Sequence, residues 1–559
     1  MSSDNIEDMV HRSYNLKPKY TQIMAGVPED YKEIRTLGDL LEINYKHVSV
    51  EEQIRTNLIV KMKNDEYPYK GIIGYDEDVI PAINRAILSG HDILFIGQIG
   101  QAKTKIAESI AKNLLSLVPV IRGSMTNDVP VSIPEEQLVN LLTGSGVLHT
   151  YPEFTISKES EETISNNKLD TKIDWIEGVN RYRYILATPD ISVKDLVGQI
   201  DAIKIAKKGV QLYDIESYSP GQLLQARHGI LCIDELPVLD PRKQVALLSV
   251  LQEGKFTTGS YPVVFKPDAK IIATANPIDY THSGKVIEPL FDRLRSHIDT
   301  HYPTNITDEM LIIVQEARIA NKKNVFLPIF ILKTVAEITK LARVHHDINH
   351  DKGVSVRMGV HSTELLVGEA ERTRSILHSV KAIPRFCDIY SIHQSCKFEL
   401  SEMEDNRQNR ISILDSIIGN AIKEVSLHYV VRLASEQITK LKDEFAKNKV
   451  FSVSQMMLGN NNNNNNNNKK TNQEDYESQL IKFPYLRSVL NETMAYIEDE
   501  QERFVDMAKQ FGIGTDIISV LQYIDGELSA SVTEVILEGL RYSQPPLLEK
   551  KGKSNYEAM

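Results

Sequence analysis

Gly97-Gln98-Ile99-Gly100-Gln101-Ala102-Lys103-Thr104 is the stretch of sequence that decides the fold. It follows a short apolar run, Ile93–Ile96, and precedes a segment in which apolar residues recur with the 3.6-residue period of a helix. A strand, a glycine-containing loop and a helix, in this order, let backbone N–H groups and a helix N-terminus bind phosphate. We therefore expect all eight residues to bind ATP, with Lys103 on the β- and γ-phosphates and the Thr104 hydroxyl on Mg²⁺.

The loop departs from its usual form at Ala102, where glycine normally precedes the lysine. Alanine can fit at this position if the residue has helical φ and ψ angles. A chance glycine-rich turn before a helix is the alternative interpretation of the loop taken alone.

Two later apolar runs end in polar side chains. Ile230–Ile233 is followed by Asp234 and Glu235, and Lys270–Ala275 is followed by Asn276. A strand buried on both faces carries no charge until its C-terminal end, where ligands bind in open α/β sheets. We expect Asp234 to hold Mg²⁺, Glu235 to act as general base on the attacking water, and Asn276 to orient that water. Alone, the acidic pair could be a solvated turn and the asparagine an ordinary Asn-Pro turn, but the order of the three segments favours one site.

Three arginines are candidates for contacts with the nucleotide. Arg293 is expected to act as an arginine finger that reaches the γ-phosphate of a neighbouring subunit, and Arg295 is its rival for that role. Arg357 begins a helical segment and could reach the nucleotide from a lid. The alternatives are a surface salt bridge for Arg293 and a solvent-facing side chain for Arg357.

The patterning of the chain predicts several divisions. From residue 69 to about 303, strand-like runs alternate with amphipathic helix-like runs, which predicts an α/β fold with a mainly parallel sheet flanked by helices. The pattern is then helical until an uninterrupted asparagine tract, Asn460–Asn468, which has no apolar group to bury. The predicted parts are an N-terminal extension (1–68), the α/β nucleotide-binding domain (69–303) with a polar insertion at about 124–180, a helical lid (304–450), a disordered Asn-rich linker (451–473), and a C-terminal helical segment with a loose polar tail (474–559).

Composition narrows the class of protein. The net charge of −12 argues against a general nucleic-acid surface, so nucleic acid is an unlikely partner. The three cysteines lack the spacing of a zinc site or a disulfide framework, which fits a reducing compartment. The N-terminus lacks the apolar core of a secretory signal, and no apolar run approaches the ~18 residues of a membrane span. We expect a soluble cytoplasmic protein with no membrane span.

Further stretches, together with the motifs above, resemble the magnesium-chelatase ATPase-subunit and MoxR-type branch of the AAA+ family. The stretches that carry the resemblance are Gly71-Ile72-Ile73-Gly74-Tyr75, Asp195–Asp201 (DLVGQID), Ser219–Ala226 (SPGQLLQA), Val245–Gly254 (VALLSVLQEG) and Gly353–Arg357 (GVSVR).

The resemblance implies more than the residues alone establish. It implies a P-loop AAA+ core followed by an all-α lid, with Ile73 lining an adenine pocket and with ATP and Mg²⁺ as cofactors. It also implies a homo-oligomeric ring of about six subunits and often a partner that carries a von Willebrand A domain.

Three functions remain open at this point. The first is a ring-forming ATPase that remodels a protein partner or assists insertion of a metal into a cofactor. The second is a nucleotide-dependent scaffold or switch with little turnover, and the third is a DNA-acting AAA+ motor. The intact Lys103, Thr104, Asp234 and Glu235 argue against the second, and the acidic balance argues against the third.

Overall fold

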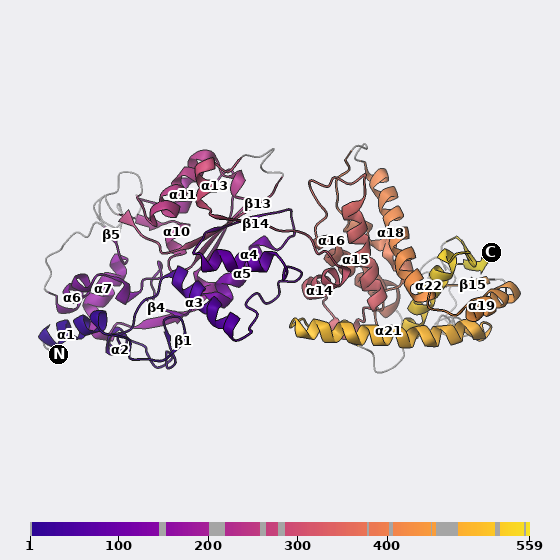
Figure 1. Cartoon of the computed structure of the whole chain (residues 1–559), viewed down its shortest axis with the longest axis horizontal. Coiled ribbons are helices and arrows are strands. Elements are labelled where there is room, and N and C mark those ends of the chain that lie inside the picture. The colour runs from indigo at the N-terminus through magenta and orange to yellow at the C-terminus, as the bar shows by residue number, and fades with distance from the viewer. Residues whose placement is uncertain are drawn as a thin grey trace, which may run out of the picture. The chain divides into compact units, whose positions relative to one another are not determined.

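The computed structural model comprises two compact units, Met1–His301 and Tyr302–Met559 (Figure 1). It describes residues 3–144, 153–200, 218–257, 264–277, 285–376, 380–401, 406–448, 450–453, 479–519, 526–552 and 555–559. The asparagine tract and most of its predicted linker lie outside these ranges.

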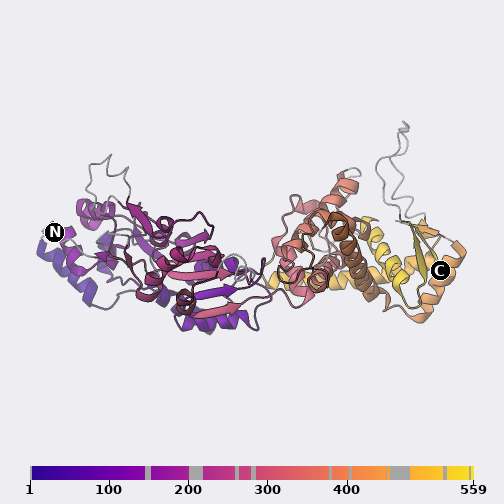
Figure 2. The ribbon, with the colours of Figure 1, turned by 90° about the horizontal axis from the view of Figure 1, so that it is seen from above.

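A five-stranded parallel sheet forms the centre of the first unit (Figure 2). Every neighbouring pair in this sheet is parallel, which confirms the predicted α/β class. The strand order is β14 (Ser296–Asp299), β3 (Ile93–Ile96), β13 (Lys270–Ala275), β10 (Ile230–Asp234) and β7 (Tyr182–Leu186).

Apolar side chains on both faces explain why these strands are nearly continuous hydrophobic runs. In β10, Leu231 and Ile233 face one core, whereas Ile230 and Cys232 face the other. The helices on the first face are α8 (Val193–Val197), α10 (Gln222–Gln225), α11 (Pro241–Glu253) and α13 (Glu288–Arg293). The helices on the second face are α3 (Val50–Lys63), α4 (Val79–Leu88) and α5 (Lys103–Leu114).

A third core joins the start of the chain to the polar insertion. Val10 and Leu37 pack in one buried cluster with Val120, Leu138 and Ile164. The elements that build this cluster are α1 (Ser3–Asn15), α2 (Leu37–Glu42), β4 (Val118–Ile121), α6 (Glu135–Thr143), α7 (Lys158–Asn167) and β6 (Ile173–Ile176). The extension and the insertion therefore fold as one body.

Short elements complete the first unit. They are β1 (Gln22–Met24), β2 (Val27–Pro28), η1 (Pro130–Ser132), β5 (Glu153–Phe154), η2 (Lys168–Asp170), η3 (Gly178–Arg181), β8 (Gly198–Ile200), β9 (Tyr218–Pro220), η5 (Leu236–Val238), β11 (Phe256–Thr257) and β12 (Val264–Phe265).

The second unit is mainly helical, as predicted. Its helices are α14 (Ile306–Glu316), η6 (Lys322–Asn324), α15 (Ile329–Val344), α16 (Arg357–Ala370), η7 (Glu371–Ser375), η8 (Phe386–Gln394), α18 (Arg407–Val430), α19 (Ser435–Asn448), α21 (Pro484–Gln510) and α22 (Gly526–Tyr542).

The prediction of a loose C-terminal tail is wrong. The tail forms β16 (Leu548–Lys551) and β17 (Asn555–Ala558). Strand β17 also pairs with β15 (Val450–Ser452), which crosses the predicted boundary between the lid and the linker. Tyr556 is only 2% exposed, and its hydroxyl donates to Oε1 of Glu538 at 2.8 Å. Leu547 and Leu548 are buried as well, so three apolar or aromatic side chains anchor this largely polar segment.

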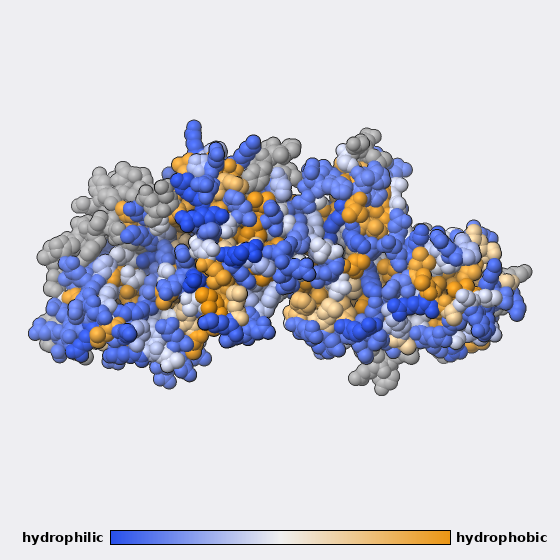
Figure 3. Space-filling view, viewed as in Figure 1, coloured by the Kyte–Doolittle hydropathy of each residue, from blue (hydrophilic) through white to orange (hydrophobic). Residues whose placement is uncertain are grey.

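The outer surface is mostly hydrophilic, with apolar patches interspersed over both units on the face shown in Figure 3. Within the described ranges, no helix combines the length and the hydropathy that crossing a membrane requires.

Candidate nucleotide site

The phosphate loop lies directly beside the tip of β13. The backbone N–H of Gly97 donates to the carbonyl of Ala275 at 3.1 Å, which continues the β3–β13 pairing into the loop. Asn276 follows Ala275 at once and is 8% exposed. The structure thus brings the loop and the predicted water-orienting amide together at the carboxyl edge of the sheet.

Thr274 connects the same strand to the acidic pair. Its hydroxyl donates to Oδ1 of Asp234 at 2.5 Å and accepts the backbone N–H of Glu235 at 3.0 Å. Thr274 is fully buried, so water does not compete for this hydroxyl. The three predicted strand ends therefore lie side by side, and Thr274 fixes Asp234 and Glu235 against β13.

The other carboxylate oxygen of Asp234 is held by β7. The Tyr184 hydroxyl donates to Oδ2 at 2.8 Å, and partial burial together with the Asp234 carboxylate raises the pKa of Tyr184. Glu235 itself has left-handed backbone angles, φ 57° and ψ 45°, where β10 turns into η5. Non-glycine residues in this region are strained, and such strain concentrates at functional sites.

Lys103 begins α5 and folds over the loop. Its ammonium donates to the carbonyls of Gly97 and Gln98, the latter at 2.9 Å. No side chain caps the N-terminus of α5, and the first turn carries no acidic residue. Thr104 is half-buried in the same turn. A positive helix end without a carboxylate in its first turn suits a phosphate group.

Hydroxyl groups of Thr300 and Tyr75 contact the phosphate loop through Gln101. The Thr300 hydroxyl, just after β14, donates to Oε1 of Gln101 at 2.8 Å. The Tyr75 hydroxyl is close to two carbonyl oxygens, at 2.9 Å from that of Gln101 and 2.8 Å from that of His301. A Cβ atom at Gly97 would collide with Thr300 and Gln101, so this glycine is required by close approach.

Ile73 lies in the same segment as Tyr75, which contacts the loop at Gln101. It is 5% exposed, and Tyr75 follows it by two residues. The flanking Gly71 and Gly74 have φ angles of 81° and 79°, which allow the tight path. Its contact with adenine stays a prediction.

The arginines occupy other parts of the chain. Arg293 is the last residue of α13, where its Nη1 donates to the carbonyl of Pro289 at 2.8 Å. Arg295 is exposed immediately before β14, at the edge of the sheet opposite the acidic pair. Arg357 is the exposed first residue of α16 in the second unit. Their contacts with nucleotide stay predictions.

Ala102 does not have the helical angles that would make alanine an easy fit. Its φ and ψ are 54° and 14°, in the left-handed region. A Cβ atom in that region costs ~1–2 kcal/mol, which explains why this position usually carries glycine.

Ala102→Gly is therefore expected to raise the free energy of unfolding by about 1 kcal/mol, the strain relieved less the larger entropy of the unfolded glycine chain. The urea midpoint of the purified protein measures this change. Ala107→Gly, in the interior of α5, is the matched control and should lower stability by at least ~1 kcal/mol. A loss of stability in Ala102→Gly as well would contradict the strain.

Sequence reasoning missed Thr274, Tyr184, Thr300 and Tyr75. Thr274 carries a readable signal, because a hydroxyl inside an otherwise apolar buried strand needs a hydrogen-bond partner. Nothing in the local sequence marks Tyr184 as a site residue. Its hydroxyl reaches Asp234 only because the register of β7 and β10 pairs Tyr184 with Cys232.

Comparison with known proteins supports the fold and the resemblance. A family model described as the sigma-54 interaction domain matches residues 213–298. The chloroplastic magnesium-chelatase subunit ChlI of Nicotiana tabacum is 25% identical over 268 residues, which cover 47% of this chain and 54% of that protein. The ChlI subunit of Glycine max is 22% identical over 329 residues, covering 57% and 69%. The chain thus spans about half the length of the tobacco relative.

Two solved structures match parts of the chain at low similarity. A model of the complex between magnesium-chelatase subunits BchI and BchD gives a TM-score of 0.31 at 15% identity, covering 60% of this chain and 97% of that chain. NtrX from Brucella abortus in complex with ATP gives 0.35 at 14% identity, covering 69% and 72%. Because these TM-scores are low, the assignment of the fold class rests on the strand order and on the sequence matches instead.

The strand order, the loop after β3 and the helical unit that follows define an α/β P-loop fold of the AAA+ class. Within that class, the curated relatives confirm the predicted resemblance to ATPases of the magnesium-chelatase and MoxR type.

Proposed function

We propose that this chain is an ATP hydrolase of the AAA+ type that couples turnover to remodelling of a protein partner or to assisted metal or cofactor insertion. The proposal rests on the hydrogen bonds between Thr274 and the acidic pair, Asp234 and Glu235. Thr274 holds Asp234 and the backbone of Glu235, next to the strand end that pairs with the phosphate loop.

In this proposal, each group has a defined task. Lys103 and the N-terminus of α5 bind the phosphates, and Glu235 takes a proton from the water that Asn276 orients. The hydroxyl of Thr104 and the carboxylate of Asp234 are hard oxygen donors that fit Mg²⁺, which would neutralise charge on the phosphates.

Assembly into a ring is part of the same proposal. Arg293 is the last residue of α13, shortly before the first residue of β14, and is proposed to serve the site of a neighbouring subunit. Arg357 is proposed to contact nucleotide from the lid. A homo-oligomer of about six subunits, a von Willebrand A partner and a cytoplasmic location complete the proposal; the three cysteines are free thiols, which fits a reducing compartment.

A second candidate is a motor that acts on a transcription complex. The match to the sigma-54 interaction domain favours it. That match covers β10, β13 and α13, which carry the ATP machinery in the first proposal, and the net charge of −12 does not favour a nucleic-acid surface. We therefore retain the remodelling ATPase as the main proposal.

Phosphate release by the purified chain, with and without Mg²⁺, tests the proposal directly. We expect Mg²⁺-dependent turnover that requires ATP, and no salt-sensitive retention on duplex DNA at physiological ionic strength. Tight ATP binding without phosphate release would support a scaffold instead, and tight DNA binding would support the second candidate.

Tyr184→Phe is expected to lower turnover about tenfold and to raise the Mg²⁺ concentration that gives half-maximal rate. The reason is that outer partners of metal-binding carboxylates typically change affinity or activity by ~10–100-fold, and this change frees Oδ2 of Asp234. A Mg²⁺ titration of the ATPase rate measures both effects.

The matched control is Tyr182→Phe, two residues earlier in β7. Its buried hydroxyl interacts with the Cys232 thiol, whereas that of Tyr184 donates to Asp234. The control should keep the wild-type Mg²⁺ dependence, and an unchanged Tyr184→Phe profile would remove Tyr184 from the site.

A further inference from the structure

Two histidines and an aspartate converge at a point away from the nucleotide site. His47 comes from the segment between α2 and α3, His228 from the residue pair before β10, and Asp268 from the loop before β13. One candidate ligand atom from each lies within 4.8 Å of the other two. Three distant segments of the chain thus contribute one donor each.

The distances suit a shared metal ion. Nδ1 of His228 lies 3.0 Å from Oδ2 of Asp268, and Nε2 of His47 lies 3.5 Å from the same oxygen. Two ligand atoms on ~2.1 Å bonds at the tetrahedral angle are about 3.4 Å apart. Both measured separations are close to that edge length.

The imidazole of His47 is buried but is held only by a long contact. Its Nε2 lies 3.5 Å from Oδ2 of Asp268, which is longer than the ~2.7–3.2 Å of an ordinary N–H···O hydrogen bond. The His228 side chain is only 4% exposed and that of His47 only 14%. A buried polar atom without a partner is costly, and it calls for a specific explanation such as an ion.

The backbone is strained at two of the three positions. His228 has φ 57° and Asp268 has φ 43°, both in the left-handed region that disfavours residues with a Cβ atom. These two residues are the ones whose ring nitrogen and carboxylate oxygen lie 3.0 Å apart.

We propose that His47, His228 and Asp268 form a site for a divalent transition-metal ion of the zinc class. Imidazole with one carboxylate is a donor set for zinc, and three protein ligands leave one tetrahedral position for water. The ion joins the segment after α2 to the start of β10 and to the loop before β13.

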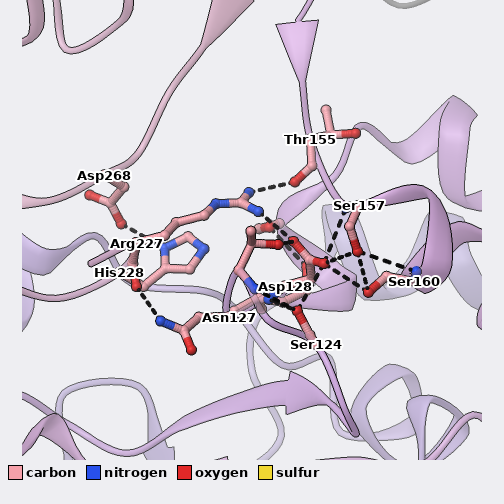
Figure 4. A network of polar contacts seen from close by, with 12 residues as sticks. Ser124, Asn127, Asp128, Thr155, Ser157, Ser160, Arg227, His228 and Asp268 are labelled. Atoms are coloured by element: carbon pink, nitrogen blue, oxygen red, sulfur yellow. Dashed lines mark hydrogen bonds and ion pairs between the residues drawn. The ribbon is translucent and has the colours of Figure 1, made fainter. Parts of the chain in front are cut away.

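Two buried guanidinium groups lie near the site: that of Arg181 donates to the carbonyl of His228, and that of Arg227 has a carboxylate partner of its own. Arg227 precedes His228, but its Nη1 pairs with Oδ1 of the fully buried Asp128 at 2.8 Å (Figure 4). Asp128 also accepts hydrogen bonds from Ser157 and Ser160, each at 2.7 Å. The positive charge of the Arg227 guanidinium is therefore balanced by the Asp128 carboxylate.

A second group of the same composition offers an internal control. His345, His346 and Asp347 are also close together, but the His346 side chain is 85% exposed. That group lies in the loop after α15 and lacks the burial of the proposed site.

Metal content of the full chain tests the proposal. After dialysis against a chelator, equilibrium dialysis with Zn²⁺ followed by elemental analysis should give one retained equivalent per chain. His47→Gln should lose that equivalent, and His346→Gln should keep it. Zn²⁺ should raise the melting temperature of the wild-type protein and of His346→Gln, but not that of His47→Gln.

Each other outcome overturns the proposal. Absence of a stoichiometric equivalent in the wild type refutes the site, and so does its retention in a folded His47→Gln protein or its loss in His346→Gln. If His47→Gln fails to fold, the wild-type chain titrated with Co²⁺ decides, because a tetrahedral site gives intense visible absorption that saturates at one equivalent. These readouts do not depend on ATP turnover, so they stand apart from the proposed function.

Discussion

Glu235→Gln is expected to lower ATP turnover by ~10²–10⁴-fold while ATP binding is retained or strengthened. The amide has the shape of the carboxylate but cannot accept the proton of the attacking water. The backbone N–H of residue 235 still meets the Thr274 hydroxyl, so the strand end keeps its position. Single-turnover phosphate release and equilibrium binding of a fluorescent ATP analogue measure the two properties separately.

The control for this substitution is Glu159→Gln, the same change on the exposed face of α7. It should leave both turnover and binding at wild-type values. Turnover that persists in Glu235→Gln would refute the assignment of the general base. The trapped ATP-bound form is also suited to isolating the protein partner by affinity purification.

Arg293→Ala is expected to reduce turnover by ~10³-fold or more, as the loss of an arginine finger does in nucleotide hydrolases. The defect arises in the neighbouring subunit, because the finger acts in trans in this proposal. Mixing Arg293→Ala with Glu235→Gln should therefore restore part of the activity. In mixed assemblies, a subunit with Arg293→Ala keeps an intact Glu235 and receives an intact Arg293 from a neighbouring subunit with Glu235→Gln.

Arg295→Ala in the same mixing experiment distinguishes the two arginines. If Arg293 is the finger, Arg295→Ala alone should retain most of the turnover. Failure of every mixture to recover activity, with oligomers present by light scattering, would contradict action in trans.

The central strands could be predicted because their chemistry is local. Ile93–Ile96 and Lys270–Ala275 are apolar runs ended by turn residues, and both are strands with those bounds. The acidic pair was identifiable for the same reason, since two carboxylates at the end of a buried strand mark its carboxyl edge.

The parts that escaped prediction depend on tertiary contacts. The hydrogen bond from Tyr184 to Asp234 requires the strand register, and the left-handed angles of Ala102 come from the loop closing onto α5. The tail after Pro545 is largely polar in sequence, yet Leu547, Leu548 and Tyr556 are buried within it. The shared core of the extension and the insertion joins segments that no local pattern connects.

That shared core has a consequence for how the protein can change over evolution. Val10 and Leu37 fill one side of it, and Leu138 and Ile164 fill the other. A descendant that lost only the extension would expose the apolar face of the insertion to water, and loss of the insertion alone would expose the extension. The two segments are therefore expected to be gained, lost and diversified together, as a single unit attached to the α/β domain.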